Sequence, residues 1–220
     1  MKTELDALKD FLVNPFNELV DELDKNPVYN KCYIATGVTG QGKTFAVTSN
    51  HIEKLLIDKD QQIVIYSVPL SEIREDEKFD TCADDLMKKH GVDVKFTAYP
   101  KIALKYLRKG KKVVFCTTHQ GIWTKISKYG NQLFNYIYNN KVKVAVFIDE
   151  AHTWTISHPD NCILVSGNGG GKYEASLFNK VSLLAEYSSY IFGITATLNR
   201  EHIGLIPTIG NMVYEVYNQM

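Results

Sequence analysis

The sequence predicts an α/β fold in which a mostly parallel sheet is covered by helices on both faces. Three observations lead to this prediction. Short apolar, β-branched segments alternate with helical stretches from residue 31 onward, a glycine-rich phosphate-loop motif follows the first of them, and a wholly apolar strand ends in two acids. The chain has 220 residues, 45% of them hydrophobic, which is enough apolar material for one sizeable core.

The expected strands are the short runs rich in Val, Ile, Phe and Tyr that turn signals separate. They cover residues 31–36, 62–68, 92–98, 112–117, 142–148 and 190–195, and a further run at 211–216 is expected to add an edge strand. Because helical stretches lie between them, these strands form repeated β-α units, and such units build parallel sheets.

The first 30 residues form an expected N-terminal helical appendage, packed on a main domain of residues 31–220. Apolar residues recur there at three- and four-residue steps, which is the spacing of an amphipathic helix. Asn14 and Pro15 divide this stretch into two helices, because Asn is a favoured N-cap and Pro fits the first helical position. The apolar residues are Leu5, Leu8, Leu12, Phe16, Leu19, Val20 and Leu23.

Charge and cysteine content narrow the function classes. Lys plus Arg and Asp plus Glu both number 25, so no global basic field is available and any nucleic-acid contact must be local. The cysteines form no C-x-x-C pair, which argues against a zinc ribbon and favours reduced core thiols. The start of the chain lacks a signal peptide's apolar core and no 18 apolar residues are consecutive, so we expect a soluble cytosolic or nuclear protein without a membrane partner.

A P-loop motif, G-x-x-x-x-G-K-[ST], is matched at every fixed position and predicts binding of a nucleoside triphosphate, with ATP favoured. Its residues are Gly37, Val38, Thr39, Gly40, Gln41, Gly42, Lys43 and Thr44. Glycines let consecutive main-chain N–H groups face one anionic centre at the start of a helix. Lys43 is then expected to reach the β- and γ-phosphates, and the Thr44 hydroxyl to coordinate Mg²⁺.

The second motif is Asp149-Glu150-Ala151-His152, directly after the apolar run 144–148. Ligands of open α/β sheets bind at the carboxyl ends of the strands, where these two acids lie. We expect Asp149 to hold Mg²⁺ and Glu150 to orient and deprotonate the attacking water. The structural alternative is that the two acids cap the following helix.

Together with the segment 193–200, these motifs resemble superfamily 2 DEAH-type helicases and translocases. Thr195-Ala196-Thr197 is similar to that family's motif III, and the resemblance implies that both threonines couple the γ-phosphate and the DEAH residues, His152 among them, to the nucleic-acid track. It spans residues 31 to 200 and implies the first, ATP-binding RecA-like domain, with ATP and Mg²⁺ as cofactors. The alternative for the threonines is plain β-propensity next to a turn.

Two weaker similarities concern nucleic acid. The strand end at Pro69 and Ser71 resembles motif Ia, and Thr118 and His119 occupy the place of a later contact motif of the family. Equally, both segments can be ordinary strand-to-helix turns whose hydroxyl groups cap helices. The T-A-T form of motif III favours DNA over RNA, by family analogy alone.

Other polar clusters receive structural interpretations. The glycine-rich stretch 167–171 is expected to be a surface loop in an insertion after the DEAH strand, and the basic run 108–112 a solvated turn with a phosphate contact as its alternative. Trp154 is expected to pack under the sheet, with base stacking as its alternative. The histidines His51, His90 and His202 lack the spacing of metal ligands.

The resemblance does not cover a second RecA-like domain. Complete enzymes of this family bind ATP between two such domains, and the second supplies arginine fingers, which are worth about 10³ to 10⁵ in rate. Arg74, Arg108 and Arg200 do not lie in a segment of that kind. We therefore expect weak hydrolysis unless a second domain or a partner chain is added.

Two other function classes stay open. A small P-loop nucleoside kinase has a similar length and an acidic pair after an apolar strand, although enzymes resembling thymidine kinases usually carry the C-x-x-C pairs that this chain lacks. A non-catalytic, ATPase-derived interaction module would not need Lys43, Thr44, Asp149 and Glu150 together. A GTPase is not supported, because the run 179–182 lacks the Asp of N-K-x-D.

Overall fold

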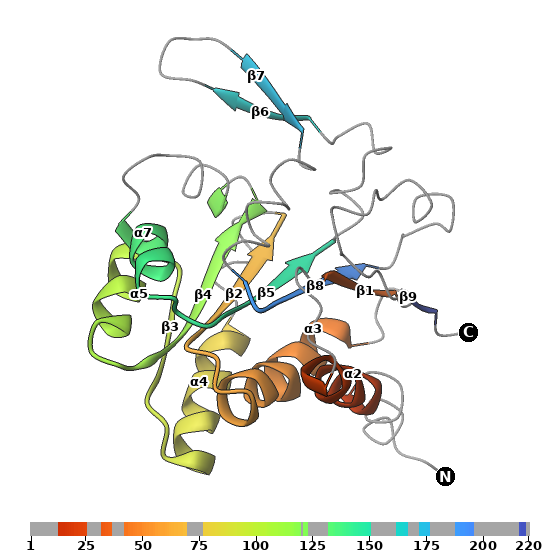
Figure 1. Ribbon diagram of the computed structural model, residues 1–220, viewed down its shortest axis with the longest axis vertical. Helices are drawn as coiled ribbons and strands as arrows, with labels where there is room; N and C mark the ends of the chain where they lie inside the picture. Colours follow the sequence, from red (N-terminus) through yellow and green to blue (C-terminus); the bar gives the residue numbers. More distant parts are fainter. Residues whose placement is uncertain are drawn as a thin grey trace.

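The computed structural model has three layers, with one large parallel sheet between two layers of helices (Figure 1). It describes residues 13–25, 32–36, 42–69, 77–119, 121–122, 132–150, 162–166, 172–176, 188–195 and 216–218. The α/β class with helices on both faces of a parallel sheet is confirmed. Within the described ranges, no helix is long and apolar enough to cross a membrane.

The central sheet has the strand order β3-β4-β2-β5-β8-β1-β9, and all of its neighbouring strands are parallel. The strands are β1 (Cys32–Thr36), β2 (Ile63–Val68), β3 (Val94–Thr97), β4 (Lys112–Thr118), β5 (Val144–Asp149), β8 (Tyr190–Thr195) and β9 (Val216–Asn218). Six of these lie within two residues of their expected positions. Strand β9 is the expected edge strand, but it begins at Val216, where the predicted run ended.

The helices divide between the two faces of the sheet. One face carries α2 (Asn14–Lys25), α4 (Glu77–His90) and a helical run made of α3 (Lys43–Ala46) and the π-helical turns η2 (Val47–His51) and η3 (Lys54–Asp58). The other face carries α5 (Pro100–Leu107) and α7 (Gln132–Asn139), which pack on each other.

Alternation along the central strands explains the two layers. In β2 and β5 every second residue belongs to one apolar cluster and the residues between belong to the other, because successive side chains of a strand point to opposite faces. All six residues of β2 are buried. A strand buried on both faces reads as a continuous apolar run, and for this reason the sequence revealed it.

A two-stranded antiparallel sheet, β6 (Cys162–Ser166) with β7 (Lys172–Ser176), is separate from the large sheet. The sequence interpretation expected an insertion here and did not predict strands. The glycine-rich stretch between them, residues 167–171, lies outside the described residues, so its expected loop conformation stays a prediction.

Helix α2 is part of the core. It begins at Asn14, as predicted from the Asn14-Pro15 pair. Phe16, Leu19 and Val20 are buried in the same cluster as Phe147 and Phe192 of the sheet. The Phe16 ring stacks on the His51 ring with centroids 3.8 Å apart, which confirms the structural interpretation of that histidine. The first of the two expected N-terminal helices falls on residues 1–12, outside the described ranges, and the domain boundaries stay predictions.

Ion pairs at the rim of α2 fix it to the end of the helical run. Lys59 Nζ lies 2.6 Å from Asp21 Oδ1 and 2.7 Å from Asp24 Oδ2, and Lys54 Nζ lies 3.1 Å from Asp21 Oδ1. The Tyr190 hydroxyl donates a hydrogen bond to Asp24. These contacts orient α2, whereas its buried apolar residues supply most of the stabilisation, because half-exposed ion pairs contribute little.

Replacing the main apolar contact of α2 is predicted to destabilise the whole domain. Phe16→Ala removes a buried ring and should lower the free energy of unfolding by about 3 kcal/mol, which corresponds to a Tm lower by roughly 6–12 °C. Lys25→Ala, in the exposed last turn of the same helix, should leave Tm nearly unchanged. Equal Tm values for Phe16→Ala and wild type in thermal unfolding would show that α2 does not belong to the cooperative core.

Candidate nucleotide-binding site

The P-loop strand and the acidic strand come together at the carboxyl edge of the sheet. Strand β8 pairs with both of them: Thr36 of β1 lies opposite Thr195, and Asp149 of β5 lies opposite Ile194. Neighbouring strands are about 4.8 Å apart, so the ends of β1 and β5 are separated by about 10 Å. Groups that follow these two strands can therefore contact one small ligand from two sides.

Gly42 starts the helical run that follows β1. Its φ of 77° and ψ of 23° place it in the left-handed region, and its carbonyl accepts a hydrogen bond from the Ala46 N–H at 2.8 Å. A side chain at Gly42 would be strained in this conformation, so the glycine of the motif has a backbone reason. It puts Lys43 and Thr44 in the first turn of α3.

The helical run is irregular directly after this turn. Thr48 Oγ1 donates to the carbonyl oxygens of Thr44 and Phe45, each at 3.2 Å, and Ser49 Oγ donates to Phe45 O at 2.7 Å. Hydroxyl groups bonded back onto the preceding turn weaken regular i to i−4 bonding, and π-helical turns follow at η2 and η3. Such turns are common next to functional sites.

Asp149 faces the helical run. Ala145 and Phe147 belong to the apolar cluster on the α3 side of the sheet, and Ile148 belongs to the cluster on the other side. Because side chains alternate along a strand, Asp149 lies on the same face as Phe147 and α3. Its carboxylate is thus directed toward the layer that contains Lys43 and Thr44.

The charges of Lys43, Asp149 and Glu150 influence one another. Burial lowers the pKa of Lys43, while Glu150 and then Asp149 oppose that shift. Burial, and next the charge of Glu150, raise the pKa of Asp149, although a main-chain hydrogen bond, the Tyr66 hydroxyl and Lys43 act in the opposite direction. The site is therefore a partly desolvated group of two carboxylates and one ammonium, which is the setting in which functional residues have perturbed pKa values.

Tyr66 was not predicted to belong to this site. Its side chain is fully buried on β2, its ring lies 6.2 Å from that of Phe147, and its hydroxyl interacts with both Thr44 and Asp149. Burial, and next the charge of Asp149, raise the pKa of Tyr66 well above its ordinary value, so the phenol stays protonated and can donate to the carboxylate. The Tyr66 hydroxyl is therefore electrostatically coupled to the P-loop threonine and to the acid of β5.

Glu150 adopts a left-handed backbone conformation with φ of 47°, which is uncommon for a residue other than glycine. Its N–H donates to Asp149 Oδ1 at 3.1 Å, so the chain turns sharply at the end of β5. Backbone strain of this kind is concentrated at functional sites. The helix that the two acids were alternatively expected to cap would begin after Glu150, where the chain lies outside the described residues.

The residues present suit Mg²⁺, the cation that the helicase resemblance implies. Mg²⁺ prefers oxygen ligands and is usually held by one or two carboxylates together with substrate phosphates. Asp149 supplies a carboxylate and Thr44 a hydroxyl, and the Tyr66 hydroxyl interacts with both. This donor set would fit a hard divalent cation, for which Thr44 and Asp149 are the candidate protein ligands, with the Tyr66 hydroxyl electrostatically coupled to both.

The described candidate nucleic-acid residues are Pro69, after β2, and Thr118 and His119, at the end of β4. They lie at the same carboxyl edge of the sheet as the nucleotide site, and β4 is next to β2 on the side away from β5. Ser67 Oγ and His119 Nδ1 are 2.7 Å apart, and both side chains are buried. Thr118 Oγ1 accepts a hydrogen bond from the Gly121 N–H at 2.9 Å, as the capping alternative describes. Pro69, directly after β2, is partly exposed. The proposed contacts of Pro69, Thr118 and His119 with nucleic acid stay predictions.

Several predicted site residues fall outside the described residues: Gly37, Val38, Thr39, Gly40, Gln41, Ser71, His152 and Thr197. Thr195 is placed by its main chain at the end of β8, between the two halves of the site.

Cys82 and Cys116 are buried free thiols, as expected, and burial raises the pKa of Cys82 to about 12.

Similarities to solved structures agree with this architecture. No protein-family model matches the sequence, and no curated protein matches it. The crystal structure of the DUF1998 helicase MrfA has 15% identity and a TM-score of 0.52 over 96% of this chain and 32% of its own. Its DNA-bound form has 16% identity and a TM-score of 0.56 over 99% and 30%. The helicase domain of Pyrococcus furiosus Hef has 16% identity and a TM-score of 0.45 over 97% and 39%.

At these identities the likeness to MrfA shows the fold alone, a RecA-like α/β fold with a parallel sheet. The chain spans about a third of the length of these neighbours. One RecA-like unit is what the sequence resemblance implied.

Neutralising Asp149 is predicted to stabilise the protein free of nucleotide and metal. Since its folded pKa is raised, the charged form is disfavoured in the folded state, and the folded state binds more protons than the unfolded chain near the ordinary Asp pKa of 3.8. Asp149→Asn should therefore raise Tm at pH 7.5 in EDTA, with each kcal/mol of unfolding free energy worth roughly 2–4 °C.

This advantage should shrink as the pH falls toward 4, where the wild-type carboxyl becomes neutral as well. Asp60→Asn is the control with the opposite sign, because a hydrogen bond from Lys112 lowers the pKa of Asp60 and its charge is stabilising. Calorimetric scans at several pH values make the comparison. A wild-type protein more stable than Asp149→Asn at pH 7.5 would contradict the desolvated site.

Proposed function

We propose that this chain is the MgATP-binding half of a nucleic-acid-dependent ATPase, a DEAH-type helicase or translocase. The observation that carries the proposal is the grouping of Lys43 and Thr44, directly after the left-handed Gly42, with Asp149 and Glu150 at the end of β5, one strand away from β1. A P-loop match can arise by chance. A P-loop lysine coupled to two carboxylates across one intervening strand is the arrangement that a metal-bound triphosphate needs.

Each residue has a distinct role in this proposal. The glycine-rich turn and the ammonium of Lys43 bind the β- and γ-phosphates, and Thr44 with Asp149 holds Mg²⁺. When bound, Mg²⁺ neutralises charge on the phosphate oxygens. Glu150 is placed beyond Asp149 to orient the attacking water and accept its proton. His152, Thr195 and Thr197 couple this site to nucleic acid, as the family resemblance implies.

In the family that the motifs resemble, ATP binds between two RecA-like domains. We propose that a second RecA-like domain, or a partner chain, completes the cleft and supplies arginine fingers. One MrfA neighbour was solved bound to DNA, which supports nucleic acid as the coupled partner and, together with the T-A-T sequence, favours DNA over RNA.

Two substitutions separate binding from hydrolysis. Lys43→Ala removes the ammonium that holds the phosphates, and should abolish ATP binding in calorimetry with Mg²⁺. Glu150→Gln should keep ATP affinity within about threefold and lower any hydrolysis by about 10² or more, because a general base contributes that much. Lys88→Ala, an exposed lysine on the other end of the same helical layer, is the matched control.

Equal ATP affinity in wild type and Lys43→Ala would contradict the proposal that ATP binds at this P-loop. Hydrolysis should rise when an oligonucleotide and a second-domain partner are supplied. Transfer of the γ-phosphate to a nucleoside by this chain alone would instead select the kinase alternative.

Tyr66→Phe tests the hydroxyl that joins Thr44 and Asp149. Partners of metal ligands typically contribute about 10- to 100-fold to metal affinity, so ATP affinity with Mg²⁺ should fall about tenfold. In EDTA the affinity for ATP should not change, because the hydroxyl does not contact the phosphates in this proposal. Calorimetric titrations of ATP under both conditions measure the difference.

Tyr190→Phe is the matched control for this prediction. Tyr190 is also a buried tyrosine of the central sheet whose hydroxyl binds an aspartate, but its partner Asp24 belongs to α2. It should leave both affinities at the wild-type value. A Tyr66→Phe variant with wild-type affinity in Mg²⁺ would show that this hydroxyl does not position the metal ligands.

A further inference from the structure

A long segment of the chain carries only positive charge. No Asp or Glu occurs between Asp93 and Asp149, although acids and bases are equally frequent in the whole sequence. The rest of the chain therefore has a net negative charge. The bases of this acid-free segment are Lys95, Lys101, Lys105, Arg108, Lys109, Lys111, Lys112, Lys125, Lys128, Lys141 and Lys143.

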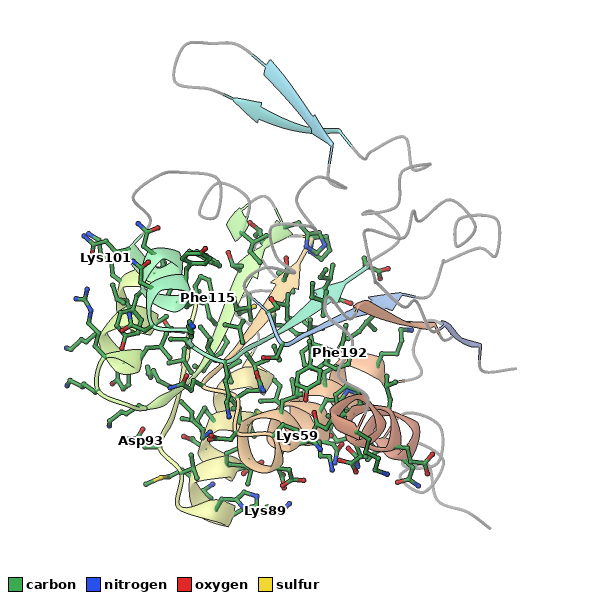
Figure 2. All side chains as sticks on the ribbon, viewed as in Figure 1. Lys59, Lys89, Asp93, Lys101, Phe115 and Phe192 are labelled. Atoms are coloured by element: carbon green, nitrogen blue, oxygen red, sulfur yellow. The ribbon has the colours of Figure 1, made fainter. Side chains whose placement is uncertain are left out.

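The fold gathers this segment in one part of the molecule. It supplies the edge strand β3, its neighbour β4, and both helices of one layer, α5 and α7, which pack on each other. Figure 2 shows Lys101 at the outer surface beside these helices, whereas Lys59 and Lys89 lie among the helices of the opposite layer. The lysines of α5 thus lie in the helical layer opposite to α2 and α4.

Acids from outside the segment neutralise only some of these bases. Lys111 pairs with Asp93, and Asp60 pairs with Lys112 at 2.9 Å and Lys143 at 3.5 Å. Lys101, Lys105 and Lys109 are exposed and form no ion pair with any residue in the described ranges. They leave an uncompensated positive surface along α5.

These three lysines follow one another at steps of four residues along α5 and the turn after it. Side chains four residues apart lie on the same face of a helix, about 6 Å apart along its axis. Like charges at this spacing disfavour a helix, and Lys101 is in the first turn, where the helix dipole disfavours a cation. Lys105, in the last turn, and Lys109, after the helix, are favoured by that dipole, but Lys101 is not, and a polyanionic partner would account for all three.

Two exposed aromatic rings belong to the same helical layer or to the residue before α5. Tyr99, the residue before α5, is 62% exposed, and Tyr138 of α7 is 60% exposed. Exposed rings next to cations are how proteins bind single strands, with bases stacked on the rings and phosphates held by the lysines. Tyr99 follows the carboxyl end of β3, so this surface reaches the same edge of the sheet as the nucleotide site.

We infer that the surface formed by α5 and the residues that flank it, with Lys101, Lys105, Lys109 and Tyr99, binds a single-stranded nucleic acid through its phosphates and bases. This surface lies on the layer of α5 and α7 and differs from the predicted nucleic-acid contacts at Pro69, Thr118 and His119. The inference rests on the proposed function, because it names a second contact surface for the nucleic acid that the ATPase would act on.

The test compares two triple variants of equal charge. Lys101→Gln/Lys105→Gln/Lys109→Gln removes the α5 lysines, and Lys25→Gln/Lys88→Gln/Lys89→Gln removes three exposed lysines of the opposite layer. Binding of a fluorescein-labelled, mixed-sequence single-stranded oligonucleotide is measured by anisotropy at several salt concentrations. Each phosphate contact to a single strand contributes about 0.7 to the slope of log K against log salt, so the α5 variant should lose about 2 from that slope.

The α5 variant should also bind on the order of tenfold more weakly at low salt, while the opposite-layer variant keeps wild-type affinity and slope. Tyr99→Ala should weaken binding of the single strand about fivefold or more and leave the salt slope unchanged, because stacking is not ionic. Equal losses in the two triple variants would reduce the effect to net charge and overturn the inference. So would unchanged binding in the α5 variant, or lysine-dependent binding to phosphatidylserine vesicles in place of the oligonucleotide.

Failure of this inference can be separated from failure of the proposed function. ATP affinity in Mg²⁺ is measured for the same proteins and should be equal in all of them, since none of the substituted residues belongs to the nucleotide site. If the wild type binds ATP and oligonucleotide but the α5 variant binds both equally well, only the inference fails. If the wild type does not bind ATP, the proposed function fails.

Discussion

The partly buried charges of Lys43, Asp149 and Glu150 are the constraint on which the site depends. Burial works against the charged forms of both Lys43 and Asp149, and each is supported by the opposite charge of the other. Two carboxylates face one ammonium, so the group by itself has excess negative charge. A cation on the Asp149 side and phosphates on the Lys43 side would satisfy all three groups, which is the logic of a metal–triphosphate site.

The parallel sheet makes this charge arrangement possible. All strands of the large sheet point the same way, so every strand end is available at one edge, and the insertion of β8 between β1 and β5 sets the spacing. Tyr66 of β2 belongs to the same site, because side-chain alternation puts its ring on the same face of the sheet as Phe147 and Asp149, and its hydroxyl is electrostatically coupled to Asp149. Local alternation and strand order together determine which groups meet.

Much of this could be predicted from the sequence, because the strong signals are local. A strand buried on both faces is a continuous apolar run, so β2, β5 and β8 were found to within about two residues. The conformation of Gly42 follows from its motif. The contact of Tyr66 with Thr44 and Asp149 could not be predicted, since it depends on strand order, and in the sequence Tyr66 is one more apolar strand residue. Strands β6 and β7 left a weaker signal, two short segments on either side of a glycine-rich stretch.

The equal numbers of bases and acids, 25 each, do not rule out a local positive surface that binds nucleic acid. A net charge of zero excludes a positive potential over the whole surface. It does not describe how the charges are divided between the two helical layers. Here the acids Asp21, Asp24 and Glu53 pair with lysines within the α2 and α4 layer, while the acid-free segment supplies the other layer. The electrostatic potential near a bound nucleic acid therefore depends on the strand order. Strands β3 and β4 lie at one edge of the sheet, and helices α5 and α7 of the acid-free segment pack in the layer beside them.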